Sequence, residues 1–265
     1  MPLSRRKIVL SGSSGGIGQF VGARLLERGA SLATISRSAS GLPSARHLTA
    51  DLSSEVGRKS AVSFVEDEQP DVLINLAGVQ YFGPAEQQSG SDVEATYAVN
   101  LIAPVLLSRA VLPAMKRKRS GQIVNIGSIL GSIGFAYFAT YSSSKAGLRL
   151  FSEALRRELA DTGIVVTYVA PRAARTGLIT RKVARYADLT KMAIDEPDGV
   201  AIRLVDAVER ADKEVFFGRA EPFFVKLNGV LPRLVDFLLA NNDRKASALF
   251  APQNFVAEEP HREHQ

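Results

Sequence analysis

The chain has 265 residues, of which 46% are hydrophobic and 23% charged, as in globular proteins and unlike disordered or fibrous chains. It has no cysteine, which excludes disulfide frameworks, thiolate metal sites and cysteine nucleophiles. It has only three histidines, which makes a histidine-based zinc site or a Ser-His-Asp triad improbable. The formal net charge of +6 suits a nucleic acid, an anionic lipid or a polyanionic small molecule.

Short β-rich runs alternate with helical stretches, which is typical of βαβ units around a parallel sheet. The expected strands cover residues 7–11, 31–36, 71–75, 121–126, 164–170 and 214–217. The expected helices cover residues 17–28, 53–68, 90–116, 140–160 and 197–210. Continuous apolar runs in the strands favour a sheet that is covered on both faces. Residues 1–250 are therefore expected to form a single α/β domain with a doubly wound, mostly parallel sheet of Rossmann type and helices on both faces.

The end of the chain departs from this alternation. Residues 219–250 are predicted to be an apolar helical extension of the domain, and the polar residues 251–265 a flexible tail. Apolar residues recur at helical spacing at Leu231, Leu234, Val235, Leu238 and Leu239. Interruption by Asn228-Gly229 and Pro232 excludes an uninterrupted transmembrane helix. Three interpretations stay open: packing on the domain or on another subunit, a roof over a cleft, or peripheral membrane contact through residues 222–250.

A glycine-rich turn follows the first expected strand. Glycines at 12, 16 and 18 allow a tight turn and let backbone amides approach a phosphate, to which a helix N-terminus adds partial positive charge. An ordinary glycine-rich βα turn has the same composition, so this motif alone does not establish a nucleotide site.

Tyr141 and Lys145 lie four residues apart on an expected helix. Because a nearby cation favours the phenolate, Lys145 is expected to lower the pKa of Tyr141, which could then exchange a proton with a substrate oxygen. Such pairs are common on helix surfaces, but Ser128 lies just past the strand 121–126, where doubly wound sheets bind ligands. The three residues together favour a catalytic site.

Five features occur together: the glycine turn, Asn75-Leu76-Ala77-Gly78, Val99-Asn100, Ser128 and Tyr141-x-x-x-Lys145. In order and spacing they resemble the short-chain dehydrogenase/reductase superfamily, in its single-domain branch, over roughly residues 5–218. The resemblance implies that Tyr141 is the general acid/base and that Ser128 stabilises the substrate oxygen. It also implies that Lys145 holds the nicotinamide ribose and that Asn100 positions a water. The implied cofactor-binding residues are Gly12, Ser14, Gly16, Ile17, Gly18, Arg37, Asp51, Leu52, Asn75, Ala77, Gly78, Tyr141, Lys145, Pro171 and Thr176.

Three positions depart from the family pattern. Ser11 replaces the usual threonine and keeps a hydroxyl, and Leu76 replaces an asparagine. Arg172 follows Pro171 where the family has glycine, which removes backbone freedom beside the nicotinamide and lets a cation reach the mouth of the substrate site.

The end of the second expected strand indicates which cofactor binds. An NAD site usually has a carboxylate there for the ribose 2′-hydroxyl, whereas an NADP site needs a cation. This chain has Ser36 followed by Arg37, so NADP(H) is expected; the alternative is that Arg37 is an ordinary surface residue.

The sequence therefore predicts an NADP-dependent oxidoreductase that interconverts a secondary alcohol and a ketone, or an alcohol and an aldehyde. Apolar residues within 176–197 favour a lipophilic substrate. The alternative is a catalytically silent NADP-binding regulator or scaffold on the same fold. No metal site and no nucleic-acid partner are expected. A homodimer or higher homo-oligomer through the helices 90–116 and 140–160 is expected, as is a cytoplasmic location, either free or at the periphery of a membrane.

Overall fold

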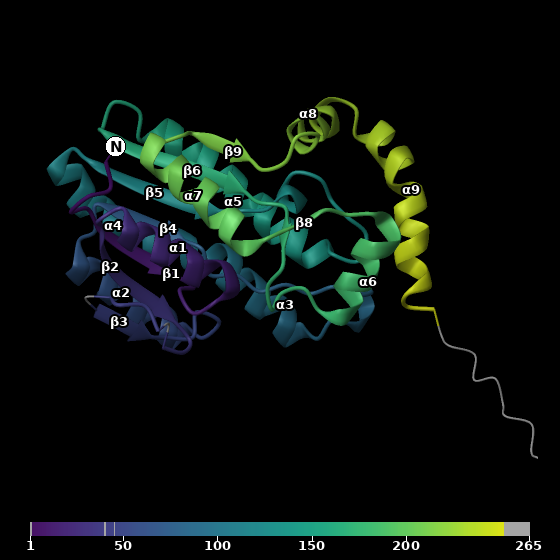
Figure 1. Cartoon of the computed structure of the whole chain (residues 1–265), viewed down its shortest axis with the longest axis horizontal. Helices are drawn as coiled ribbons and strands as arrows, with labels where there is room; N and C mark the ends of the chain where they lie inside the picture. Colours follow the sequence, from purple (N-terminus) through teal and green to yellow (C-terminus); the bar gives the residue numbers. More distant parts are fainter. Residues whose placement is uncertain (1, 40, 45, 252–265) are drawn as a thin grey trace, which may run out of the picture.

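The computed structural model describes residues 2–39, 41–44 and 46–251, so the expected tail lies, apart from Ala251, outside the described residues. At its centre is a seven-stranded sheet in the order β3-β2-β1-β4-β5-β6-β9, in which all paired strands are parallel (Figure 1). The expected doubly wound α/β fold is thereby confirmed. The strands are β1 (Lys7–Ser11), β2 (Ser31–Ser36), β3 (Arg46–Thr49), β4 (Val72–Asn75), β5 (Gly121–Ile126), β6 (Ile164–Ala170) and β9 (Glu214–Phe216).

Helices cover both faces of the sheet because successive strand residues point to opposite sides and both sets are apolar. Ile8 and Ile74 pack under the layer formed by α1 (Gly16–Glu27) and α7 (Pro197–Arg210). Val9 and Leu73, one position away in each strand, pack under the opposite layer. That layer consists of α2 (Glu55–Glu68), α4 (Ala103–Lys118) and α5 (Ala139–Glu158).

The expected helix 90–116 is composite. It consists of α3 (Gly90–Tyr97), a π-helical turn η2 (Ala98–Ile102) and α4. The whole stretch Gly90–Lys118 is long and apolar enough by composition to cross a membrane, but 56% of its most apolar window is buried inside this structure. It is therefore a core helix of the α/β fold. Insertion of an extra residue per turn at η2 is a deviation that often accompanies functional sites.

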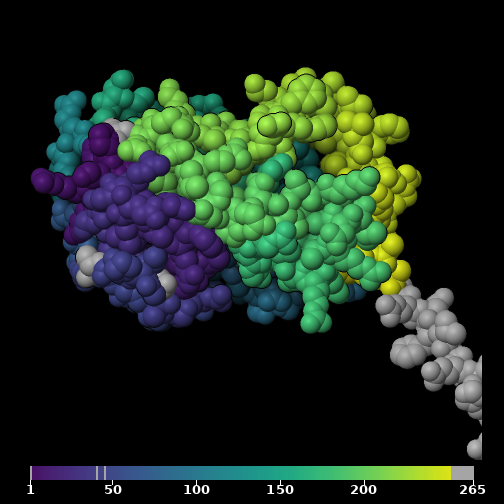
Figure 2. Space-filling model, in the orientation of Figure 1, coloured from purple at the N-terminus to yellow at the C-terminus, as the bar shows by residue number. Residues whose placement is uncertain are grey.

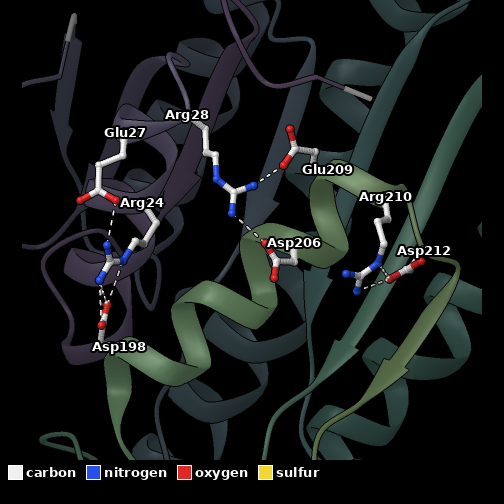
Figure 3. A network of polar contacts seen from close by, with 8 residues as sticks. All are labelled: Arg24, Glu27, Arg28, Asp198, Asp206, Glu209, Arg210 and Asp212. Carbon is white, nitrogen blue, oxygen red and sulfur yellow. Dashed lines mark hydrogen bonds and ion pairs between the residues drawn. The ribbon is translucent and has the colours of Figure 1, made fainter.

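Ion pairs join α1 to α7 across the outer side of one helix layer (Figure 3). Arg24 binds Asp198 through two nitrogens, with Nε–Oδ1 at 3.0 Å and Nη2–Oδ2 at 2.7 Å. Arg28 contacts both Asp206, at 2.8 Å, and Glu209. Because these side chains are about one-third exposed, each pair adds little to stability, and the apolar contacts beneath hold the two helices together.

A small two-stranded sheet and three further helices complete the chain. The strands β7 (Ala173–Ala174) and β8 (Ile194–Asp195) close the base of a loop that carries α6 (Arg181–Thr190). The C-terminal extension forms α8 (Glu221–Val230) and α9 (Pro232–Ala248) at one end of the molecule (Figures 1 and 2). Asn228-Gly229 lies inside α8, so only Pro232 marks the break between the helices.

The extension packs on the rest of the chain through a minority of its apolar residues. Val225 and Val235 are buried against Tyr168 of β6 and against Ile129 and Ile133 in the segment after β5. Of the helix face expected from Leu231 onward, only Val235 is fully buried, while Leu234 and Leu238 remain 43% and 50% exposed. The structure thus shows packing on the domain that leaves much of the apolar surface uncovered.

A buried amide network links the layers near the carboxyl ends of β4 and β5. Asn75 donates to Asn125 Oδ1 at 2.9 Å, and Asn125 donates to Ser152 Oγ of α5, also at 2.9 Å. The Asn75 amide also lies 3.4 Å from Ser108 Oγ of α4. All four residues are fully or almost fully buried, so each hydrogen bond replaces one that water would otherwise supply.

Replacing Asn125 with alanine should lower the free energy of unfolding by about 2–3 kcal/mol, because Asn75 and Ser152 then lose a partner in the core. Urea denaturation measures the change. Asn241→Ala, at an exposed position of α9, is the control and should change stability by less than about 0.5 kcal/mol. Equal effects of the two substitutions would show that the network contributes nothing to stability.

Candidate active site

A cavity of about 720 Å³ lies beyond the carboxyl ends of the central strands, where doubly wound sheets bind ligands. Segments that follow β1, β2, β4, β5 and β6 line it, together with the loop between β7 and β8. Most of the residues expected at the site do so: Gly12, Ser14, Gly16, Ile17, Arg37, Asp51, Leu52, Ala77, Gly78, Ser128, Tyr141, Lys145, Pro171 and Thr176.

Three expected site residues are not among those that line the cavity. A Cβ on Gly18 would lie 2.0 Å from the carbonyl oxygen of Gly12, so Gly18 serves the close packing of α1 on the turn. Asn75 directs its amide into the buried network, because the strand's alternation turns its side chain toward α4 and α5. Asn100 is fully buried and makes its hydrogen bonds beside the cavity.

The glycine turn after β1 is pressed against the turn after β4. Gly12 has a φ of +79°, and a Cβ there would lie 2.7 Å from the backbone of Ala77. The Ser11 hydroxyl accepts hydrogen bonds from the amides of Leu76 at 3.1 Å and Ala77 at 3.3 Å. The hydroxyl that serine keeps at this position thus links the two turns. The turn leads into α1, whose first residue is Gly16 and whose first turn holds no acidic residue. This helix N-terminus is therefore suited to an anion.

The other end of the cavity holds charged and polar side chains. The last residue of β2 is Ser36, so the end of this strand carries a hydroxyl and not a carboxylate. Ser36 is buried and donates to the carbonyl of Ser38 at 2.7 Å. Hydrogen bonds from the amide and hydroxyl of Ser53 lower the pKa of Asp51, and the charge of Arg37 lowers it further. Asp51 is thus ionised and Arg37 lies within its electrostatic reach.

Tyr141, Lys145 and Ser128 all line the cavity. Tyr141 and Lys145 come from the first turns of α5 and are 8% and 4% exposed. Ser128 lies two residues past the end of β5, directly before η3 (Ile129–Gly131). The hydroxyl groups of Tyr141 and Ser128 are hydrogen-bonded. Lys145 Nζ donates to the carbonyl of Ile126 at 2.9 Å. A phenol, an alcohol and an ammonium thus line one cavity.

Burial dominates the acid–base properties of these groups. It raises the pKa of Tyr141, and the hydrogen bond with Ser128 offsets only part of that increase. Burial also lowers the pKa of Lys145 to about 8. Lys145 does not lower the pKa of Tyr141 as expected. Its ammonium binds the carbonyl of Ile126 and lies 6.0 Å from the centre of the tyrosine ring. Tyr141 is consequently protonated at neutral pH.

Asn100 sits within the π-helical turn and fixes the backbone next to Lys145. Its Oδ1 accepts from the Val79 amide and its Nδ2 donates to the Val79 carbonyl, each at 2.9 Å. Nδ2 also donates to Ser144 Oγ at 3.0 Å. These bonds join the loop after β4 to α5 one residue before Lys145, so the Asn100 side chain positions the site.

Apolar side chains line the part of the cavity beyond Tyr141. Of the apolar residues within 176–197, Leu178, Ile179, Val183 and Met192 line it, whereas Tyr186, Leu189 and Ile194 do not. Sequence reasoning missed Tyr81, Leu130 and Phe138. Their closeness in sequence to Gly78, Ser128 and Tyr141 was the available signal. Phe138 stacks on Phe82 with ring centres 4.5 Å apart, which makes this wall rigid and apolar.

Arg172 lines the cavity but binds two carboxylates. Its Nε donates to Asp195 Oδ2 at 3.1 Å, and its Nη1 donates to Glu221 Oε1 at 3.0 Å. The hydrogen bonds that Arg172 donates, first to Asp195 and then to Glu221, raise the pKa of its guanidinium. The residue that replaces a glycine of the family pattern thus connects the end of β6 to β8 and α8.

Comparisons with known proteins agree with this architecture. The sequence model of the family described as short chain dehydrogenase matches residues 6–187. The ketoacyl reductase HetN of Nostoc sp. is 29% identical over 98% of this chain and 99% of its own. The 3-ketodihydrosphingosine reductase of Bacteroides thetaiotaomicron is 32% identical over 77% of each chain. A short chain dehydrogenase from Burkholderia cenocepacia, solved with NADP, shares the fold with a TM-score of 0.76 at 24% identity, covering 90% of this chain and 99% of its own.

Replacing Arg172 with methionine should loosen the segment 175–194 and α8, because Asp195 and Glu221 lose their shared cation. We expect amide hydrogen exchange there to accelerate roughly ten-fold or more, as for other lost charge-assisted hydrogen bonds. Exchange in β1 and β5 should not change.

The matched control is Arg175→Met, whose ion pair with Glu196 is 67% and 69% exposed and should matter little. Equal acceleration in both variants would show that Arg172 has no special positioning role.

Proposed function

This chain belongs to the short-chain dehydrogenase/reductase superfamily, and on that premise we propose that it is an NADP(H)-dependent oxidoreductase that interconverts a lipophilic ketone or aldehyde with its alcohol. The observation that carries the proposal is the buried meeting of Tyr141, Ser128 and Lys145 at the cavity. An intact set of proton-transfer groups supports an enzyme over a catalytically silent regulator or scaffold.

The chain's own residues donate and accept the proton that the reaction requires. When bound, the nicotinamide supplies or accepts the hydride. Tyr141, held protonated by burial, donates its proton to the substrate oxygen during reduction and takes it back during oxidation. The Ser128 hydroxyl, already hydrogen-bonded to Tyr141, binds the same oxygen. Lys145 carries its charge at neutral pH, since its pKa is about 8, and we assign it to holding the nicotinamide ribose, because it lines the cavity with its Nζ on the Ile126 carbonyl.

The residues of the cavity fit NADP(H). Gly12 and Gly16 keep side chains away from the N-terminus of α1, where a Cβ on Gly16 would lie 2.7 Å from the Thr176 side chain, so the pyrophosphate could reach the backbone amides. Ser36 leaves the end of β2 without a carboxylate, and Arg37 is exposed beside it for the 2′-phosphate. Neighbouring structures were solved with NADP, NADPH and, in the case of 4-hydroxyisoleucine dehydrogenase, NADH. The choice of NADP(H) therefore depends on Arg37.

The apolar wall formed by Leu130, Phe138, Val183 and Met192 supports a lipophilic substrate. Two relatives are called ketoacyl reductase and 3-ketodihydrosphingosine reductase, and both names refer to a keto compound. We accordingly propose a ketone carried on an aliphatic chain as the substrate class.

A symmetric dimer through α4 and α5 is part of the same proposal. On α5, Leu148 and Leu155 are buried within this chain, whereas Ala146 and Leu150 are exposed. The exposed pair supports an interface on that side of α5.

Tyr141→Phe should reduce kcat for carbonyl reduction by roughly 100- to 10,000-fold, because the variant has no proton to donate. The dissociation constant for NADPH should stay within about two-fold, since only a hydroxyl is removed. Steady-state kinetics with ketones of graded chain length, together with NADPH fluorescence titration, measure both quantities. Tyr137→Phe, outside the cavity, is the control and should keep wild-type kcat. Turnover by Tyr141→Phe near the wild-type rate would refute the assignment.

Arg37→Asp should weaken NADPH binding by roughly ten-fold or more, because a carboxylate replaces the cation beside the 2′-phosphate. NADH, which lacks that phosphate, should bind with little change. Titrations of both cofactors with this variant and with Arg117→Asp, an exposed position at the end of α4, give the comparison. Equal losses for NADPH and NADH in Arg37→Asp would show that Arg37 does not recognise the phosphate.

A further inference from the structure

Large apolar side chains are concentrated on the surface of the C-terminal extension. Among the described residues, exposed large apolar side chains outside it are spread along the chain, at Phe20, Val56, Ile102, Leu150, Leu178, Leu189 and Ile202. On α8 and α9 they gather into one set, here termed the exposed apolar surface: Phe223, Phe224, Val230, Leu231, Leu234, Phe237 and Leu238. The side chains of Phe237 and Val230 are 78% and 77% exposed. Exposed apolar patches of this kind are rare in monomeric soluble proteins and usually mark a binding surface.

The helical repeat separates the acidic residues of α9 from its exposed leucines. On α9, Val235, Leu239 and Ala246 form the side that packs inward. Leu234 and Leu238 lie on one side of that buried stripe, whereas Asp236 and Asp243 lie on the other. The acidic residues of α9 are thus turned away from its exposed leucines.

Cations accompany the apolar side chains. Lys226 lies on the solvent face of α8, and Arg233 lies in the first turn of α9 next to Leu234. Both are exposed, as is Arg219 just before α8. The one acid of α8, Glu221, is bound to Arg172 and faces the core of the chain. With a net charge of +6, the molecule as a whole favours an anionic partner.

We propose that α8 and α9 dock on an anionic lipid surface, with the exposed apolar surface entering the headgroup boundary and Lys226 and Arg233 binding the headgroups. The two helices have 10 and 17 residues and are broken at Pro232, so they lie along the surface and do not cross the membrane. A second copy of this chain would meet the same cations with like charge, which disfavours it as the occupant.

The extension is also in contact with the loop that covers the cavity. Lys245 donates to the carbonyl of Leu189 at 2.9 Å, and Ala246 packs with Tyr186 of α6. Docking would therefore bring α6, which contributes Val183 to the cavity, close to the lipid phase (Figure 2 shows α6 and α9 side by side at this end of the molecule). The docking proposal does not rest on the proposed reaction, and it is tested without a turnover measurement.

Co-sedimentation of the full-length protein with vesicles tests the proposal. Wild-type protein should pellet with vesicles of phosphatidylcholine mixed with phosphatidylglycerol, less with phosphatidylcholine alone, and less as salt is raised. The double variant Phe237→Ser/Leu238→Ser should lose binding to both. Lys226→Gln/Arg233→Gln should lose roughly ten-fold or more on the anionic vesicles and little on the neutral ones.

The matched control is Val56→Ser/Ile202→Ser, which removes two exposed apolar side chains elsewhere and should pellet like the wild type. NADPH titration and circular dichroism confirm that each variant is folded. Wild-type protein that stays in the supernatant with anionic vesicles, or a Phe237→Ser/Leu238→Ser variant that pellets equally, overturns the proposal. If the wild type does not pellet and light scattering shows that this variant loses an oligomeric state, a second copy covers the surface instead.

Discussion

The close approach of two backbone turns, the one after β1 and the one after β4, sets the geometry on which the site depends. A Cβ on Gly12 would stand 2.7 Å from Ala77, and the Ser11 hydroxyl holds that contact by accepting from two amides of the second turn. Because β1 and β4 are neighbours in a parallel sheet, both turns emerge at the same edge and open toward the same cavity. The N-terminus of α1 therefore faces the residues that follow β4, and a ligand with a phosphate at one end can reach both.

Tyr141 and Lys145 are placed by polar contacts buried behind the cavity. Asn125 joins β5 to α5 through Ser152, while Asn100 joins the loop after β4 to α5 through Ser144. These bonds fix α5 in rotation as well as in distance, since a hydrogen bond between side chains tolerates little change in direction. Apolar packing alone would hold the helix against the sheet with less control over which residues face the cavity. The same burial that requires these bonds raises the pKa of Tyr141 and lowers that of Lys145.

Most of the fold and much of the site could be predicted from the sequence because both depend on local periodicity and on motif spacing. Strands β1, β2, β5 and β6 lie within the expected bounds, and Tyr141, Lys145 and Ser128 share one cavity. The direction of the Asn75 side chain could not be predicted, since a polar residue at the end of a strand can face either a ligand or a neighbouring helix, and only the strand's register decides which. The π-helical turn at Asn100 has no composition that distinguishes it from an ordinary helix. Periodicity correctly indicated an apolar face on α9 but could not tell whether that face is covered, because burial depends on contacts far apart in the sequence.

Arg172 connects the departure from the family pattern to the C-terminal extension. A glycine at this position, as in the family, could not reach Asp195 or Glu221, so β8 and α8 would lose their common partner beside the cavity. With arginine, one guanidinium binds the base of the loop that carries α6 and the first turn of α8. The opposite end of the extension meets the same loop again where Lys245 binds Leu189. The extension is thus held to the covering loop at two points, and a partner that binds its exposed apolar surface would act on the loop through both.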